Sequence, residues 1–195
     1  METLSDLVFG LALSVGALAL VAQPPTSVGA LYTHLTAFGF SFVILILVWL
    51  SYTRIMAVHA AEDRRTIVLN AALLFSVSIE PFLFNLLFGA NQGSVFIGAV
   101  SQAYSLDLGV MIGVLGLFSW DLAVGRRPSL APAVQYSLRR EAGARWLVAG
   151  IYAVSAAPIF FQPLVFTQPV RIWIWAIGLG VLFWARGRAP NLEEP

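Results

Sequence analysis

Two carboxyl groups interrupt apolar segments, and they are the residues of this chain best suited to chemistry. Glu80 lies in the apolar run at about 66–88, and Asp107 lies in the run at about 95–120. A charged, unpaired carboxylate costs at least about 2.5–3.5 kcal/mol at the centre of a membrane, so we expect both acids to be protonated there. They are either a proton-relay pair or cation site, or neutral groups that hydrogen-bond one helix to another.

Each acid has a hydroxyl neighbour in its own segment. Ser76 precedes Glu80 by four residues, and Tyr104 precedes Asp107 by three. Residues three or four apart share a helix face. We therefore expect Ser76 to bond Glu80 and Tyr104 to bond Asp107. No basic residue lies at a comparable depth in these segments, so an ion pair is not expected.

Enzymatic or metal-binding chemistry is not indicated elsewhere. His34 and His59 stand in no metal-ligand spacing, and they are predicted to be loop or interface residues. The absence of Cys excludes disulfides and thiolate ligands. There is no Gly-rich phosphate loop and no His-Glu-x-x-His motif. The sequence therefore predicts no enzyme, no catalytic residues, no bound metal and no cofactor.

The composition shows what kind of molecule holds these residues. Of the 195 residues, 59% are hydrophobic and only 11% are charged, against about a quarter charged in soluble domains. Mean hydropathy is +0.84. The net charge of +1, without a basic block, argues against a nucleic-acid partner. The chain is predicted to be a membrane protein with several spans.

Six transmembrane helices are predicted, because a span needs about 20 mostly apolar residues. The stretch from Leu7 to Thr53 has no charged residue and is too long for one helix, so it is divided at 23–27. The first helix is predicted to be retained, because Glu2 and Asp6 do not fit the basic start of a signal peptide. The fold is thus a single all-α domain, 1–195, with helices at about 4–22, 31–56, 66–88, 95–120, 145–166 and 170–185.

The arginines agree with this number of helices. All 11 basic residues are Arg, and ten of them fall on one predicted side, with only Arg171 on the other. Cytoplasmic loops carry the excess of basic residues, so both termini are predicted to be cytoplasmic. The ten are Arg54, Arg64, Arg65, Arg126, Arg127, Arg139, Arg140, Arg145, Arg186 and Arg188.

The first helix carries two stripes with helical spacing. The bulky stripe is Leu4, Val8, Leu11, Val15 and Leu18. The neighbouring small stripe is Gly10, Ser14, Ala17 and Val21. Small residues let helices approach closely in lipid. Periodicity alone therefore favours a bulky stripe that faces lipid and a small stripe that faces a neighbouring helix.

Several motifs occur together in one order along the chain. Leu4-Ser5-Asp6 opens the first helix, Trp49-Leu50-Ser51-Tyr52-Thr53-Arg54-Ile55-Met56 closes the second, and Leu69 to Phe82 holds Asn70, Leu73-Leu74-Phe75 and Pro81-Phe82. Tyr104 and the apolar run to Trp120 follow. Over residues 3–120 this pattern resembles the transmembrane protein 175 family of potassium channels. The family's own motifs are Phe-Ser-Asp, Trp-x-x-His-x-Arg-Leu-Phe and Asn…Leu-Leu-Phe…Pro-Phe.

The resemblance implies a homotetramer in a lipid bilayer that passes K⁺ or other monovalent cations. In that family the first helices line the pore, and ions cross a constriction of apolar side chains. Carried over by position, the constriction is Leu11, Val15 and Leu18, with Ser14 where the family often has Thr. The bulky stripe then faces the pore instead of lipid. A narrow apolar ring can close a pore by dewetting.

The family's Ser, Asp, Trp and His form a polar network that braces the pore helix. By position these are Ser5, Asp6, Trp49 and Tyr52, so a phenol replaces the imidazole. Leu4 replaces the motif Phe. These departures indicate a divergent member of the family.

The sequence thus predicts a passive, potassium-leaning cation channel of the cell membrane. The alternative is a proton-coupled transporter that uses Glu80 and Asp107. A third possibility is a non-conducting membrane scaffold.

Overall fold

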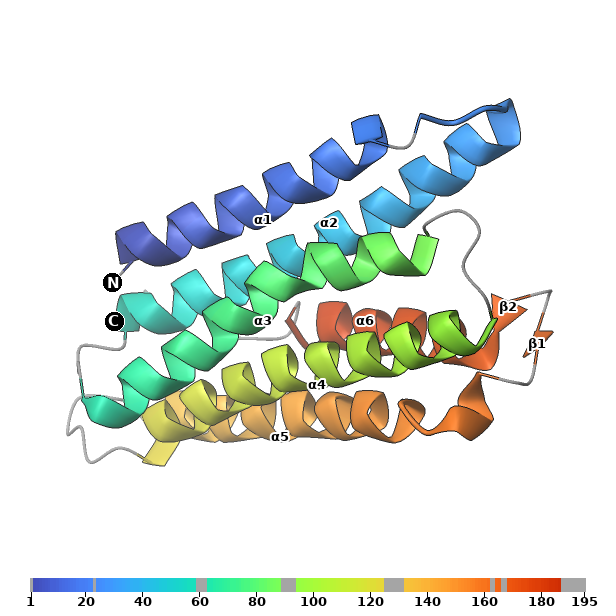
Figure 1. The fold of residues 1–195 in the computed structure, drawn as a ribbon. Coiled ribbons are helices and arrows are strands. Elements are labelled where there is room, and N and C mark those ends of the chain that lie inside the picture. The colour runs from blue at the N-terminus through green and yellow to red at the C-terminus, as the bar shows by residue number, and fades with distance from the viewer. Residues whose placement is uncertain are drawn as a thin grey trace.

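The computed structural model describes residues 2–22, 24–58, 63–88, 94–124, 132–161, 164–165 and 168–186. Within these ranges the main elements of the fold are all helices (Figure 1), as the sequence predicts. The helices are α1 (Glu2–Ala22), α2 (Val28–Val58), α3 (Arg64–Phe88), α4 (Ser94–Val124), α5 (Pro132–Ser155) and α6 (Val170–Arg186). A 3₁₀ turn (Pro158–Phe160) and two antiparallel two-residue strands, β1 (Leu164–Val165) and β2 (Gln168–Pro169), connect α5 to α6. The strand pair was not predicted.

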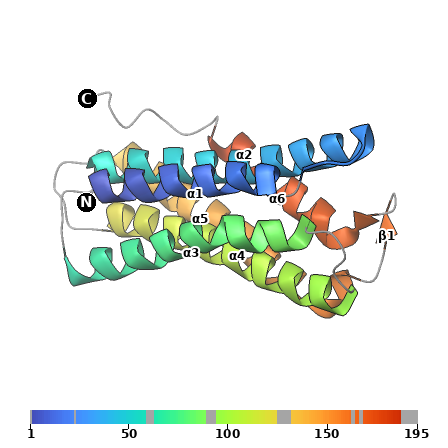
Figure 2. The same ribbon diagram turned by 45° about the horizontal axis from the view of Figure 1, so that its top comes forward.

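The six helices of the described ranges lie side by side along an elongated bundle (Figures 1 and 2). One end, called here the arginine end, gathers the start of α1, the end of α2, the start of α3, the end of α4 and the start of α5. The strand pair and the start of α6, with Arg171, lie at the opposite end, called here the strand end. His34 lies on α2 and is partly exposed, whereas His59, Arg126, Arg127 and Arg188 fall outside the described residues.

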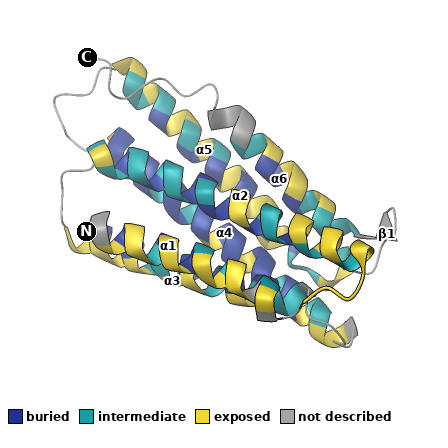
Figure 3. Cartoon of the chain, turned by 90° about the horizontal axis from the view of Figure 1, so that it is seen from above, coloured by how far each residue is buried: buried dark blue, intermediate teal, exposed yellow. Residues whose placement is uncertain are grey.

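Helix α4 forms the centre of the bundle. Its buried side chains recur every three or four residues, as one face of a helix requires. They include Tyr104, Leu108, Met111, Leu115 and Phe118. Helix α5 packs along α4 more extensively than any other helix does, and α3 covers another side. Helix α1 lies at the edge of the bundle, where it contacts α2 and α3 and leaves a broad face exposed (Figure 3).

Three described helices are long and apolar enough to cross a membrane. They are Val28–Val58, Arg64–Leu87 and Val95–Val124. Shorter apolar stretches lie in α1, at Leu4–Leu18, and in α6, at Val170–Leu182. These helices support a membrane location for the protein.

The fifth helix does not lie where the sequence analysis predicts it. It was expected at about 145–166, but α5 begins at Pro132 and ends at Ser155. Proline suits the first turn of a helix, because that turn needs no donor from it. Leu138, Ala142 and Arg145 follow steps of four and three and are buried. The polar stretch before residue 145, predicted to be a loop, therefore forms the first half of α5 from Pro132 onward. This half is amphipathic, and its narrow inner face packs on the bundle.

Candidate functional site

Helix α1 has one buried face, which joins it to the rest of the subunit. Ser5, Phe9 and Ala12 are buried at steps of four and three, as on one face of a helix. The Phe9 ring lies 6.0 Å from the Tyr52 ring, and Gly16 faces the Phe38 ring. Through this face α1 packs against Tyr52 and Phe38 of α2.

Much of the rest of α1 is exposed in a single copy of the chain. The side chains of Leu11, Val15 and Leu18 are all exposed, and Leu11 is 62% exposed. The small stripe of Gly10, Ser14, Ala17 and Val21 is exposed as well. The expectation that the small stripe faces a neighbouring helix is therefore wrong within the subunit, since Ser5, Phe9 and Ala12 fill that role. Residues of both stripes remain available to a partner, to lipid or to water.

Ser14 makes a local bond inside α1. Its hydroxyl donates to the Gly10 carbonyl oxygen at 2.8 Å, four residues earlier. Such bonds are common for Ser within helices. The Ser14 proton is thus used in a bond to the backbone. The lone pairs of the hydroxyl oxygen remain available as acceptors on the exposed face.

Two hydrogen bonds connect the first turns of α1 to the end of α2. The hydroxyl oxygens of Ser5 and Tyr52 lie 2.7 Å apart, in a buried position. The Trp49 indole Nε1 donates to Asp6 Oδ1 at 2.9 Å. The structure therefore brings Ser5, Asp6, Trp49 and Tyr52 together as two contacting pairs.

Glu80 is fully buried where three helices meet. The Ser41 hydroxyl of α2 lies 2.9 Å from both carboxyl oxygens of Glu80. The Tyr104 hydroxyl of α4 donates to Glu80 Oε1 at 2.9 Å. The predicted bond from Ser76 to Glu80 is replaced by these contacts, because donors on facing helices reach the carboxyl. Ser41 had not been singled out from the sequence.

Asp107 also takes its partner from another helix. Ser76 of α3 hydrogen-bonds its carboxyl group, whereas Tyr104 turns to Glu80. The two hydroxyl partners are thus exchanged across the interface of α3 and α4, so that Tyr104 bonds Glu80 and Ser76 bonds Asp107. Among the described residues, Asp107 Oδ2 is buried with no hydrogen-bond partner.

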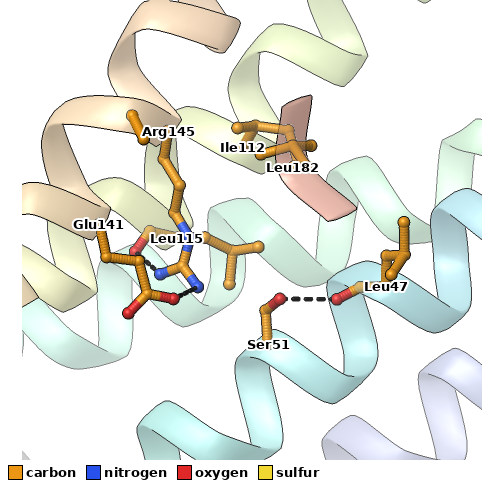
Figure 4. Close-up of a pocket in the computed structure, with 8 residues that line it drawn as sticks. Leu47, Ser51, Ile112, Leu115, Glu141, Arg145 and Leu182 are labelled. Atoms are coloured by element: carbon orange, nitrogen blue, oxygen red, sulfur yellow. Dashed lines mark hydrogen bonds and ion pairs between the residues drawn. The ribbon is translucent and has the colours of Figure 1, made fainter. Parts of the chain in front are cut away.

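Two arginines are buried, which the sequence analysis did not anticipate. Arg145 donates to the Leu115 carbonyl oxygen at 3.1 Å, bonds the Ser119 hydroxyl and forms an ion pair with Glu141 at 2.6 Å. The i, i+4 spacing of Glu141 and Arg145 was the available signal. Figure 4 shows this pair beside a small cavity of about 30 Å³, where Ser51 donates to the Leu47 carbonyl oxygen. These contacts hold α5 against α4.

Arg171 performs a similar task at the strand end. Its guanidinium donates to the carbonyl oxygens of Ser155, Ala156 and Ala157 at 2.6–3.2 Å and also bonds the Ser101 hydroxyl. Helix ends leave carbonyl oxygens without intrahelical donors. Arg171 therefore supplies those donors to the end of α5 and ties it to α4 and α6.

Residues 1–81 match the family model described as endosomal/lysosomal potassium channel TMEM175. Over these residues the chain is similar to the TMEM175 family of potassium channels. The match agrees with the resemblance that the sequence shows, and it spans α1, α2 and α3 as far as Pro81. No match was found among curated proteins or among solved structures.

The TMEM175 match covers Ser5, Asp6, Trp49 and Tyr52, and it includes Glu80 but not Asp107. Because TMEM175 is a potassium channel family and not an enzyme class, the match supports a cation channel in a membrane. The match also supports the passage of K⁺.

Proposed function

We propose that the chain is a potassium-leaning cation channel formed by four copies, with α1 of each copy lining the pore. The observation that carries this proposal is the division of α1 into a braced face and an exposed apolar face. The braced face is bonded to α2 through Ser5 and Asp6, while Leu11 on the other side is 62% exposed. The family match over residues 1–81 includes this whole arrangement.

In the proposed channel, Leu11, Val15 and Leu18 form the constriction. Their side chains lie at steps of four and three on the exposed face of α1. Four copies of such a stripe around an axis would make a narrow apolar neck, which hinders hydrated ions until it is wetted. Ser14, whose hydroxyl oxygen keeps lone pairs beside this stripe, would offer an oxygen to a passing cation.

The bracing pairs would fix the rotation of α1 about its own axis. Ser5–Tyr52 and Asp6–Trp49 both act near the start of α1, at the arginine end. Two bonds at successive residues restrain rotation more than one bond does. They would therefore keep Leu11 and its neighbours directed at the pore.

We propose six spans in each subunit, with both termini and the arginine end in the cytoplasm. Arg54, Arg64, Arg65, Arg139 and Arg140 lie on the helix ends that gather there. The positive-inside rule supports this orientation. The polar first half of α5 would then lie at the cytoplasmic surface.

Potassium flux into liposomes containing the purified protein tests the constriction. The wild-type protein should pass K⁺, and Leu11→Ala should raise the flux severalfold, because a wider and less apolar neck wets more easily. Leu147→Ala is the matched control, since Leu147 on α5 is a leucine with 63% exposure. Absent flux would refute the channel, and equal flux in wild type and Leu11→Ala would remove Leu11 from the constriction.

The buried acids support a second candidate, a proton-coupled transporter. Glu80 and Asp107 lie inside the bundle, and within the described residues the side chains that hydrogen-bond them are hydroxyl-bearing. This function predicts substrate uptake that a pH gradient drives and that Glu80→Gln abolishes, because an amide cannot release the proton. Uptake that persists in Glu80→Gln would reject the transporter and leave the channel.

A further inference from the structure

The polar cluster of Glu80, Asp107, Ser41, Ser76 and Tyr104 is built from oxygen-bearing side chains of three helices. Glu80 is fully buried and Asp107 is 8% exposed. The two carboxyl groups lie close together, since Tyr104, three residues before Asp107, bonds Glu80, and Ser76, four residues before Glu80, bonds Asp107. A buried pair of neighbouring carboxyls resists the second ionisation, because the like charges repel and neither is solvated.

No basic side chain of the described residues is paired with the cluster. In the described part of the chain, no ion pair involves Glu80 or Asp107. The titratable groups that face the cluster are Tyr104 on α4 and, next to Tyr104, Tyr152 on α5. Helix α2 contributes the Ser41 hydroxyl, and α6 contributes the Trp175 ring, which lies 4.9 Å from the Tyr104 ring. A bound proton is therefore what lowers the charge of the pair.

The two acids differ in how well they could hold a charge. Glu80 has two hydroxyl donors within 2.9 Å, from Ser41 and Tyr104, which suit a carboxylate. Asp107 is bonded by Ser76, but its Oδ2 atom is buried without any partner in the described residues. A bare anionic oxygen in such a place is strongly disfavoured, whereas a neutral carboxyl group is tolerated better.

We propose that this cluster is a proton-binding site at the interface of α3 and α4, with Asp107 as the residue that carries the proton and Glu80 as its hydroxyl-bonded neighbour. Release breaks the O–H bond of the Asp107 carboxyl, passes the proton to water and leaves a second carboxylate beside Glu80. The new charge repels Glu80 and weakens the packing of α3 on α4. The inference concerns the subunit alone and does not depend on whether the protein conducts ions.

Infrared spectroscopy of the purified full chain at neutral pH tests the assignment, because a protonated carboxyl group has a C=O stretch that a carboxylate lacks. The wild-type protein should show this band, Asp107→Asn should lose it, and Glu80→Gln should keep it. A band that survives in Asp107→Asn, or that Glu80→Gln removes, would overturn the placement of the proton. The absence of the band from the wild type would overturn the site.

Asp121→Asn is the matched control, since Asp121 on α4 forms an ion pair with Arg65 at 3.0 Å and lies outside the cluster. It should keep the band. If Asp107→Asn does not fold, a band that persists in Glu80→Gln still excludes Glu80 as its source, and titration of the wild type tests release of the proton. As pH rises, the band should disappear together with a fall in melting temperature. A band lost without any fall in melting temperature would contradict the effect on packing.

Discussion

Tyr52 joins three helices through one hydrogen bond and two ring contacts. Where the family pattern has His, the phenol of Tyr52 bonds Ser5 at 2.7 Å and its ring lies near those of Phe9 and Phe118, at 6.0 and 6.5 Å. The longer side chain therefore joins α1 to α2 through a hydroxyl and joins both to α4 through ring contacts. A polar link to the first helix survives in this divergent sequence.

Removing only the hydroxyl isolates that link. Tyr52→Phe should lower the free energy of unfolding by about 0.5–1.5 kcal/mol, because the Ser5 hydroxyl loses this partner in a buried place. Thermal or denaturant unfolding in detergent measures the change. Tyr32→Phe, at a tyrosine that is exposed on α2, should have no measurable effect. Equal stability of Tyr52→Phe and the wild type would argue against the link.

At the residue scale, sequence motifs pointed to polar side chains that lie in contact, but not to all of the partners of the buried acids. Motif order brought forward Ser5 and Tyr52, which are in contact. The partners of Glu80 and Asp107 were assigned wrongly, because i, i+4 spacing shows only which residues share a helix face. Which facing helix supplies a donor depends on the packing of α2, α3 and α4, and a single sequence does not encode that directly.

At the scale of helices, α6 approaches α5 closely at one glycine. A Cβ atom on Gly178 would overlap the ring of Tyr152, whose hydroxyl donates to the Trp175 carbonyl oxygen at 3.1 Å. The Tyr152 ring therefore fits in this place only because Gly178 has no side chain. Gly180, two residues later on α6, faces open space.

The two glycines make a matched pair of variants on one helix. Gly178→Ala should destabilise the protein by about 1–3 kcal/mol, because the added methyl group forces the Tyr152 ring aside. Gly180→Ala should be neutral or slightly stabilising, since alanine favours a helix over glycine. Melting temperatures of the two variants check this. Similar melting temperatures would show that the close approach of α5 and α6 is not required.

Helix positions could be predicted from apolar length, except where a helix is amphipathic. Five of the predicted helices overlap α1, α2, α3, α4 and α6. The charged outer face of α5, with Arg139 and Arg140 exposed, concealed a buried inner face that includes Leu138. The buried Arg145 was counted among surface charges for the same reason. A charge count alone does not separate a loop from a helix that has only one narrow apolar face.

At the scale of the whole molecule, one copy of the chain leaves an apolar helix, α1, at its edge. Helix α1 is held by α2 and α3 on one side, and the opposite side, with Leu11 and Leu18, is uncovered. The best-packed helix, α4, lies in the centre and holds the buried acids. This arrangement suits the proposed channel. In that channel the interior of each copy holds the fold together, and its edge meets other copies around an axis.

The most direct test places a thiol in the proposed constriction. The chain contains no Cys, so Leu11→Cys introduces the only thiol, and Leu147→Cys is the control with equal exposure on α5. Potassium flux into liposomes is measured before and after a membrane-impermeant thiol reagent is added. We predict that the reagent strongly reduces flux through Leu11→Cys and leaves Leu147→Cys and the wild type unchanged. Flux through Leu11→Cys that the reagent does not alter would contradict a pore lined by α1.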